Sequence, residues 1–150
     1  MRRLGKARKL SFLIFIGLVC ASCSADMSGS AQSRMKSWMD GTGLISSSSQ
    51  ILTDIKNIKI SIKGDDLSSL HSLCVVLGND VQDANGNLPS PNTAVTNELS
   101  LGYSQIYSQS VSCYKAAAKS QIEAEIASMN KSFLLIQDAI SVSKAIVGSS

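Results

Sequence analysis

Apolar side chains recur at alternating steps of three and four residues along four stretches of the chain, 44–62, 67–84, 99–117 and 122–147. In the second stretch the series is Leu67, Leu70, Cys74, Leu77, Val81 and Ala84. This spacing places the apolar residues on one face of an α-helix. Four amphipathic segments joined by short connections predict an all-α protein, an antiparallel bundle of about four helices.

Residues that stop and start helices separate these stretches. Gly64-Asp65-Asp66 ends the first and offers an acidic cap to the second, because a carboxylate accepts the free amide hydrogens of the opening turn. Asparagine, glycine and two prolines make 85–91 the clearest loop, after which Asn92 or Thr93 can cap the third helix. The residues that end and cap helices therefore agree with the apolar periodicity.

Two places leave an alternative open. Ser120 and Glu123 have capping-box spacing, which predicts a break near 115–119, but the three alanines there favour one continuous helix. Isoleucines alternate with polar residues over 58–62, as in a half-buried strand. Because the chain offers this strand no partner, a helix is the better prediction.

The N-terminus has the pattern of an export signal. Five basic residues precede the apolar run Leu10–Val19, which is about half the length of a bilayer-spanning helix, and small residues follow it. Cleavage after Ala25 would release a secreted protein. The competing prediction is cleavage before Cys23, because 19–23 resembles a bacterial lipoprotein signal. A lipid on that cysteine would anchor the protein at the outer face of the bacterial cell membrane.

The sequence predicts a signal peptide over residues 1–25, an N-terminal segment 26–43 that is partly helical or flexible, and a bundle over 44–150.

Removal of the signal peptide changes the net charge of the protein. Five of the fourteen basic residues lie in it, and all eleven acidic residues follow it, so nine minus eleven leaves −2. With its remaining basic residues scattered, the protein is not expected to bind nucleic acid. Contact with a membrane is expected only through the signal peptide or a lipid anchor.

Two cysteines, Cys74 and Cys113, remain wherever the signal is cut. In an oxidising compartment they are predicted to form a disulfide, which would stabilise the fold by about 4 kcal/mol. Cys74 lies about eleven residues before the end of its helix and Cys113 about twenty after the start of the next. At about 1.5 Å per residue, a tight turn between the two helices would leave the cysteines about 13 Å apart along the bundle. We therefore expect the loop 85–91 to climb along the bundle.

Two cysteines flank a proline-containing loop between the second and third predicted helices. The full pattern is Leu73-Cys74, Leu77, Asp80-Val81, Leu88-Pro89-Ser90-Pro91, Leu99, Tyr103 and Val111-Ser112-Cys113. These residues cover about half of the mature chain, and the pattern resembles exported actinobacterial helical proteins, secreted or lipid-anchored, without an assigned function. The resemblance implies a disulfide-linked bundle in the cell envelope and supplies no active site.

Candidate catalytic and metal sites are weak. The single histidine, His71, flanks the core face near two serines, but serine is abundant throughout and no G-x-S-x-G turn is present. The segment 83–87 is similar to the start of a calcium loop, yet Val81 and Asn92 occupy the positions that require carboxylates. We therefore predict no enzyme, metal or cofactor, and a half-exposed structural role for His71.

Surface chemistry supplies the remaining candidates. Tyr103, Tyr107 and Tyr114 form a stripe that serves either core packing or a ligand or partner surface together with Trp38. Serine-rich faces, such as 46–49, permit close approach of a partner helix and motivate a hypothesis of self-association or partner binding; the alternative is a solvated exterior with no partner. The leading prediction is a non-enzymatic exported module that binds a protein or cell-envelope component. The alternatives are a carrier of a small apolar, lipid-like ligand and, third, a hydrolase that uses His71.

Overall fold

The computed structural model describes residues 29–64 and 66–149, and all regular structure within these residues is helical. The helices are α1 (Ala31–Thr42), α2 (Leu44–Ser61), α3 (Leu67–Asn85), α4 (Thr93–Lys115) and α5 (Lys119–Gly148). The all-α class is confirmed, and the described residues form five helices, four of them within the predicted bundle and α1 in the segment before it. The predicted signal peptide, with Cys23, lies outside the described residues.

The additional helix, α1, occupies most of the segment predicted as partly helical or flexible. Ser30 caps it by accepting a hydrogen bond from the Ser33 amide at 3.2 Å. It ends at Gly43, whose φ of +60° is the left-handed conformation that glycine adopts without strain, and α2 starts at the next residue. Only Met35 of α1 is fully buried, which explains why periodicity did not reveal this helix.

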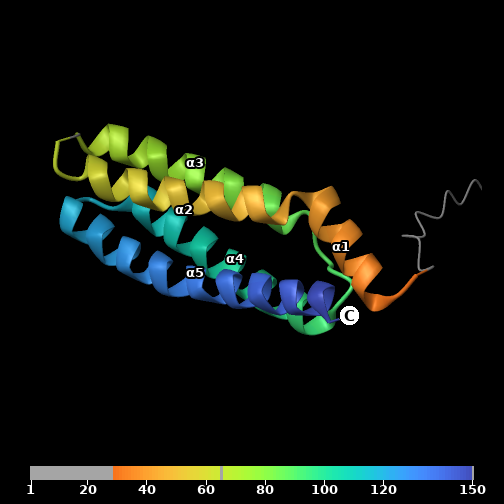
Figure 1. Cartoon of the computed structure of the whole chain (residues 1–150). Coiled ribbons are helices and arrows are strands. Elements are labelled where there is room, and N and C mark those ends of the chain that lie inside the picture. Colours follow the sequence, from red (N-terminus) through yellow and green to blue (C-terminus); the bar gives the residue numbers. More distant parts are fainter. Residues whose placement is uncertain (1–28, 65, 150) are drawn as a thin grey trace, which may run out of the picture.

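Helices α2 to α5 form a closed ring of neighbours, in which α2 packs on α3, α3 on α4, α4 on α5, and α5 returns to α2. Figure 1 shows α2 and α3 as one layer over α4 and α5, with α1 at the end of the bundle beside the C-terminal end of α5. The two seams that join the layers, α2–α5 and α3–α4, therefore lie on opposite sides of the molecule.

The helix boundaries agree closely with the predicted caps. Asp66 accepts a hydrogen bond from the Ser69 amide at 2.8 Å, and Asn92 accepts one from the Val95 amide at 3.1 Å. The strand alternative over 58–62 is wrong, because α2 extends to Ser61 and Ile62 is its C-cap. Its alternating pattern arises from Ile60, which is 70% exposed on the outer face of the helix.

The break between α4 and α5 is real, but its cap differs from the expected one. The side chain of Gln121 accepts hydrogen bonds from the amides of Ala117 (2.6 Å) and Ala118 (3.2 Å). Ser120 instead lies within the first turn of α5. The run of three alanines therefore does not join the two helices.

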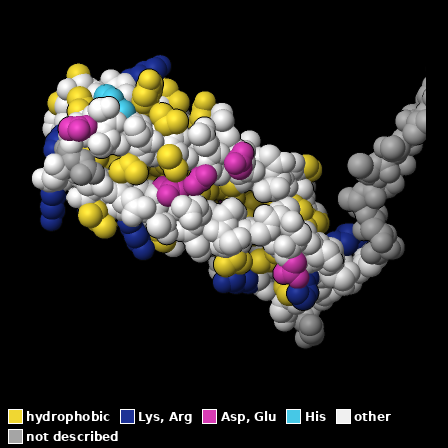
Figure 2. Space-filling view, turned by 90° about the horizontal axis from the view of Figure 1, so that it is seen from above, with side chains coloured by type: hydrophobic (Ala, Val, Ile, Leu, Met, Phe, Trp, Pro, Cys, Tyr) yellow, Lys and Arg dark blue, Asp and Glu magenta, His cyan; other side chains and the backbone are white. Residues whose placement is uncertain are grey.

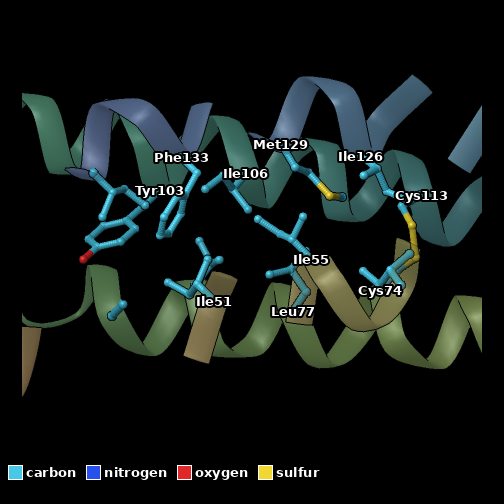
Figure 3. Close-up of a cluster of buried hydrophobic side chains, with 14 of the residues drawn as sticks. Ile51, Ile55, Cys74, Leu77, Tyr103, Ile106, Cys113, Ile126, Met129 and Phe133 are labelled. Carbon is cyan, nitrogen blue, oxygen red and sulfur yellow. A yellow bond between two sulfur atoms is a disulfide. The ribbon is translucent and has the colours of Figure 1, made fainter. Parts of the chain in front are cut away.

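The core fills the space between the four long helices. Its fully buried large side chains are Met35, Ile51, Ile55, Ile58, Leu70, Leu77, Leu99, Tyr103, Ile106, Ile122, Met129 and Ile136. Figure 3 shows the Cys74–Cys113 disulfide at one end of a central part of this cluster and Tyr103 at the other. The disulfide is thus confirmed as a link between α3 and α4, with the two Cα atoms 5.8 Å apart.

The loop between α3 and α4 runs outward from the end of α3 to the more distant start of α4, as the alignment of the cysteines requires (Figure 1). Ser90 is buried in it and bonds with Thr96 through their hydroxyl groups at 2.9 Å. The Trp38 indole nitrogen donates to the Asn87 carbonyl at 3.2 Å. Helix α1 is therefore attached to this loop.

Glycines set the closest helix approaches. A Cβ at Gly102 would lie 2.9 Å from Ile136 Cγ1 and 3.4 Å from the Ser132 carbonyl oxygen on α5. A Cβ at Gly78 would lie 2.8 Å from the Ser110 hydroxyl on α4. The α4–α5 and α3–α4 seams are therefore tight because each contains a helical position without a side chain.

Candidate functional site

The α2–α5 seam is the least extensively packed of the four in the ring, and it holds two open pockets of about 340 and 330 Å³. The first is lined by Ile45, Ser48, Ser49, Leu52, Phe133, Gln137, Ile140, Ser141 and Lys144. The second is lined by Lys59, Ile62, Lys63, Glu123, Ile126, Ala127 and Asn130. On both helices these residues recur at helical spacing, so the pockets share one seam. We call this feature the α2–α5 groove.

The floor of the α2–α5 groove is apolar, and its rim is mainly basic. Phe133 and Ile126 are each 5% exposed at its base, whereas Ile45 is 43% exposed at one edge. Three lysines line the groove, one at the end near α1 and two at the opposite end, against the single acidic residue Glu123. The groove therefore combines apolar surface with a net positive charge.

The opposite seam carries a third, smaller pocket of about 140 Å³, which we call the α3–α4 groove. Its lining residues are Cys74, Val75, Gly78, Asn79, Gln82, Tyr107, Ser110, Val111 and Tyr114. None of these described residues carries a charge, and Val75, Tyr107 and Tyr114 are 43%, 39% and 50% exposed. Figure 2 shows exposed hydrophobic side chains gathered near the histidine.

The structure separates the four aromatic residues that the sequence groups as a surface. Tyr103 is 1% exposed and belongs to the core, and burial raises its pKa to about 12, with a smaller opposing effect of Ser48. Tyr107 and Tyr114 line the α3–α4 groove. Trp38 lies half-buried on α1, bonded to the loop after α3. Only two of the four thus share a surface.

His71 connects α3 to the junction of α4 and α5. Its Nε2 lies 2.9 Å from the Ala116 carbonyl oxygen, to which it donates, and its ring meets the Tyr114 ring edge-on at 5.7 Å. The neighbouring Ser72 hydroxyl donates to the Ser68 carbonyl of its own helix at 3.1 Å. These contacts give His71 a role in fixing the helix junction.

The most perturbed carboxyl group lies between α2 and α3. Asp54 is 6% exposed, its Oδ1 accepts a hydrogen bond from Gln50 at 2.9 Å, and its Oδ2 has no hydrogen-bond partner. Burial first and the neighbouring Asp80 second raise the pKa of Asp54 to about 6. Asp54 is therefore partly protonated near pH 6, in which state it can donate a hydrogen bond to Asp80.

Two features are absent from the described part of the chain. Within residues 29–64 and 66–149, no three histidine, cysteine or acidic side chains come together as a metal site would require. Among the helices described in these ranges, none has the length and apolar character needed to cross a membrane. The disulfide itself is consistent with an oxidising, extracellular environment.

Comparison with known proteins identifies no relative. No protein family, no curated protein and no solved structure matches this chain. The resemblance to exported actinobacterial proteins therefore stays a prediction.

Sequence reasoning did not find the α2–α5 groove or the buried Asp54. The groove arises from residues that flank the two apolar stripes, and periodicity assigns flanking positions to solvent rather than to a seam. A usable signal exists for the tight seams, because Gly78 and Gly102 interrupt otherwise regular helices and glycine is unfavourable there. Asp54 lies in register with the apolar residues of α2, and this position is a signal in the sequence that its carboxyl group is buried.

Proposed function

We propose that the protein is a non-enzymatic, exported binding module, and that its α2–α5 groove binds an amphipathic helix of another protein in the cell envelope. The observation that carries this proposal is the long, apolar, open groove along the least packed seam of the bundle. From Ile45 on α2 to Lys63, two residues beyond the end of that helix, the groove spans eighteen residue steps, or about 27 Å. That length suits about five turns of a partner helix.

The walls and rim of the groove favour a particular partner surface. Ser48, Ser49 and Ser141 are small, so a helix can approach closely over the apolar floor. Helix-in-groove recognition uses apolar anchors at steps of three and four residues. Because Lys59, Lys63 and Lys144 surround the groove, we expect acidic residues to flank those anchors.

The proposal is tested by crosslinking in the native host. A photoreactive benzoylphenylalanine is placed at Gln137, an exposed residue of the groove, and in a matched control at Ser104, exposed on α4. We expect a discrete protein adduct from position 137 and none from 104. Equal adducts from both positions, or none from position 137, would contradict helix binding in this groove.

A charge-reversal pair tests the role of the rim. Lys59→Glu combined with Lys144→Glu should lower the yield of the adduct by about tenfold, since both lysines would otherwise attract an acidic partner. Lys131→Glu is the control, because Lys131 is exposed on α5 and lines neither of the two pockets. An equal loss in the control would mean that overall charge, and not the groove, governs binding.

A second candidate is an apolar-ligand carrier, favoured by the pocket near Phe133. Its volume of about 340 Å³ lies within the range of small-molecule sites, and its floor is apolar. The pocket is open to solvent, which suits a partner helix better than an enclosed lipid chain. In the crosslinking experiment, an adduct with the mass of a lipid instead of a polypeptide would select the carrier.

A further inference from the structure

We propose that Asp54 and Asp80 form a proton-dependent latch, which holds α2 against α3 in acid and loosens α2 as the medium becomes neutral. Asp54 is 6% exposed on α2, and its Oδ2 is buried without a hydrogen-bond partner. Asp80 is partly buried on α3, the helix beside α2 in Figure 1, and it acts on Asp54 both as a hydrogen-bonding group and as a like charge. The latch does not depend on what occupies the α2–α5 groove.

No positive charge balances these two carboxyl groups. The Gln50 amide, from α2 itself, donates to Asp54 Oδ1 at 2.9 Å, and Asp80 is the charged group of α3 that acts on Asp54. Neither α1 nor α5, the other helices packed on α2, adds a described charged side chain that perturbs it. In the described part of the chain, the one ion pair joins Lys36 and Asp40 on α1. A proton is therefore what can satisfy the pair within the packed seam.

The two protonation states of the pair have opposite effects on the contact between α2 and α3. With one proton between the carboxyl groups, Asp54 donates a hydrogen bond to Asp80, and the buried pair is satisfied. When both groups are ionised, neither can donate, and two like charges meet at a site that water reaches poorly. Burial and Asp80 raise the pKa of Asp54 to about 6. Because the closed seam binds the proton more tightly than an open one, a rise in pH favours opening.

Helix α2 is built to respond locally. Gly43 precedes it with a φ of +60°, and α2 has no side-chain cap at this end. Gly64 follows it in the connection to α3, where an added Cβ would meet nothing within 4 Å. Its seam with α5 is the least extensively packed in the ring, whereas the disulfide links α3 to α4. A displacement of α2 therefore disturbs the fold least, and it moves one wall of the α2–α5 groove.

The test is hydrogen exchange of the disulfide-bonded protein at pH 4 and pH 8, with rates corrected for the pH dependence of unprotected amides. If opening returns Asp54 to an ordinary pKa, protection of the α2 amides 51–58 should fall by about fiftyfold from pH 4 to pH 8. At pH 8 these amides should also exchange at least about tenfold faster than amides 103–112 of α4, because α2 opens while the rest of the bundle stays folded.

Two results would overturn the latch. One is α2 protection that does not change between the two pH values. The other is equal protection of α2 and α4 at pH 8, because α2 would then be released only when the whole protein unfolds.

Substitutions separate the two carboxyl groups from general effects of pH. Asp54→Asn should make the protection of α2 independent of pH. Asp80→Asn leaves Asp54 buried but removes the like charge, and should reduce the change to less than about tenfold. Asp83→Asn is the matched control, because Asp83 is exposed on α3 one turn after Asp80, and it should keep the full change. An undiminished change in Asp54→Asn or in Asp80→Asn would contradict the pairing, as would its loss in Asp83→Asn.

Discussion

The α3–α4 and α2–α5 seams lie on opposite sides of the same bundle and are built in different ways. On α3–α4 a disulfide and Gly78 bring the helices together, and the space left is small and uncharged. On α2–α5 the lining residues include neither a glycine nor a cystine, and the pockets are more than twice as large. The difference indicates that one side holds the bundle together while the other leaves open pockets between its helices.

Helix α2 packs less favourably than the other long helices against its two neighbours in the ring, α5 and α3. Toward α5 it leaves the open groove, and toward α3 it places the carboxyl of Asp54 next to that of Asp80. A buried carboxyl beside a like charge opposes folding when it ionises. Four changes, in order of decreasing expected effect on stability, test the difference between the tight and the loose side.

Removing the covalent link should have the largest effect. Cys74→Ala with Cys113→Ala opens a cross-link that spans 39 residues, and the free energy of unfolding should fall by about 4 kcal/mol. Urea titration followed by circular dichroism measures this change. A loss below about 1 kcal/mol would show that packing alone holds α3 against α4.

Neutralising the buried carboxyl should stabilise α2 in a pH-dependent way. The folded pKa of Asp54, about 6, lies above its usual value, so the folded state binds an extra proton and the protein loses stability as pH rises from about 4 to about 6. Asp54→Asn should therefore raise the free energy of unfolding by about 2 kcal/mol at pH 8 and change it little at pH 4.

Urea titrations of the Asp54→Asn variant at the two pH values check this result. Asp138→Asn serves as the control, since Asp138 is exposed on α5 and should show no such dependence. An Asp54→Asn protein with equal changes at pH 4 and pH 8 would refute the buried-carboxyl explanation.

Adding a single methyl group should distinguish a tight seam from an open surface. Gly102→Ala forces Cβ against Ile136 and the Ser132 carbonyl, and we expect a loss of about 1–2 kcal/mol despite better helix propensity. Gly41→Ala meets nothing within 4 Å in α1 and should stabilise by about 0.5–1 kcal/mol. Thermal unfolding of the two variants should therefore show shifts of opposite sign.

Filling the open groove should have the smallest effect on stability. Ser141→Leu adds apolar volume to the wall of the α2–α5 groove and should change the free energy of unfolding by no more than about 0.5 kcal/mol. The same variant should abolish the crosslinked adduct from position 137, since a leucine blocks close approach. A large loss of stability would mean that the wall is closely packed rather than open.

The sequence alone determined the helical class, the four long helices and the caps of two of them, α3 and α4. Regular apolar spacing identified the buried faces of α3 and α5. The caps were located to 65–66 and 92–93, where the structure has Asp66 and Asn92, because a cap depends only on its own turn. The pairing of Cys74 with Cys113 followed from having two cysteines in the predicted mature bundle. The strand alternative within α2 and the location of the final cap were decided only by the structure.

Tertiary structure alone decided the existence of α1 in the fold and the position of both grooves. Helix α1 has one fully buried residue, so its stability depends on α5 and the loop at Asn87 more than on its own pattern. A groove depends on how closely two helices approach, which is set by side chains from both. Periodicity describes one helix at a time, and therefore shows which face is buried but not which seam stays open.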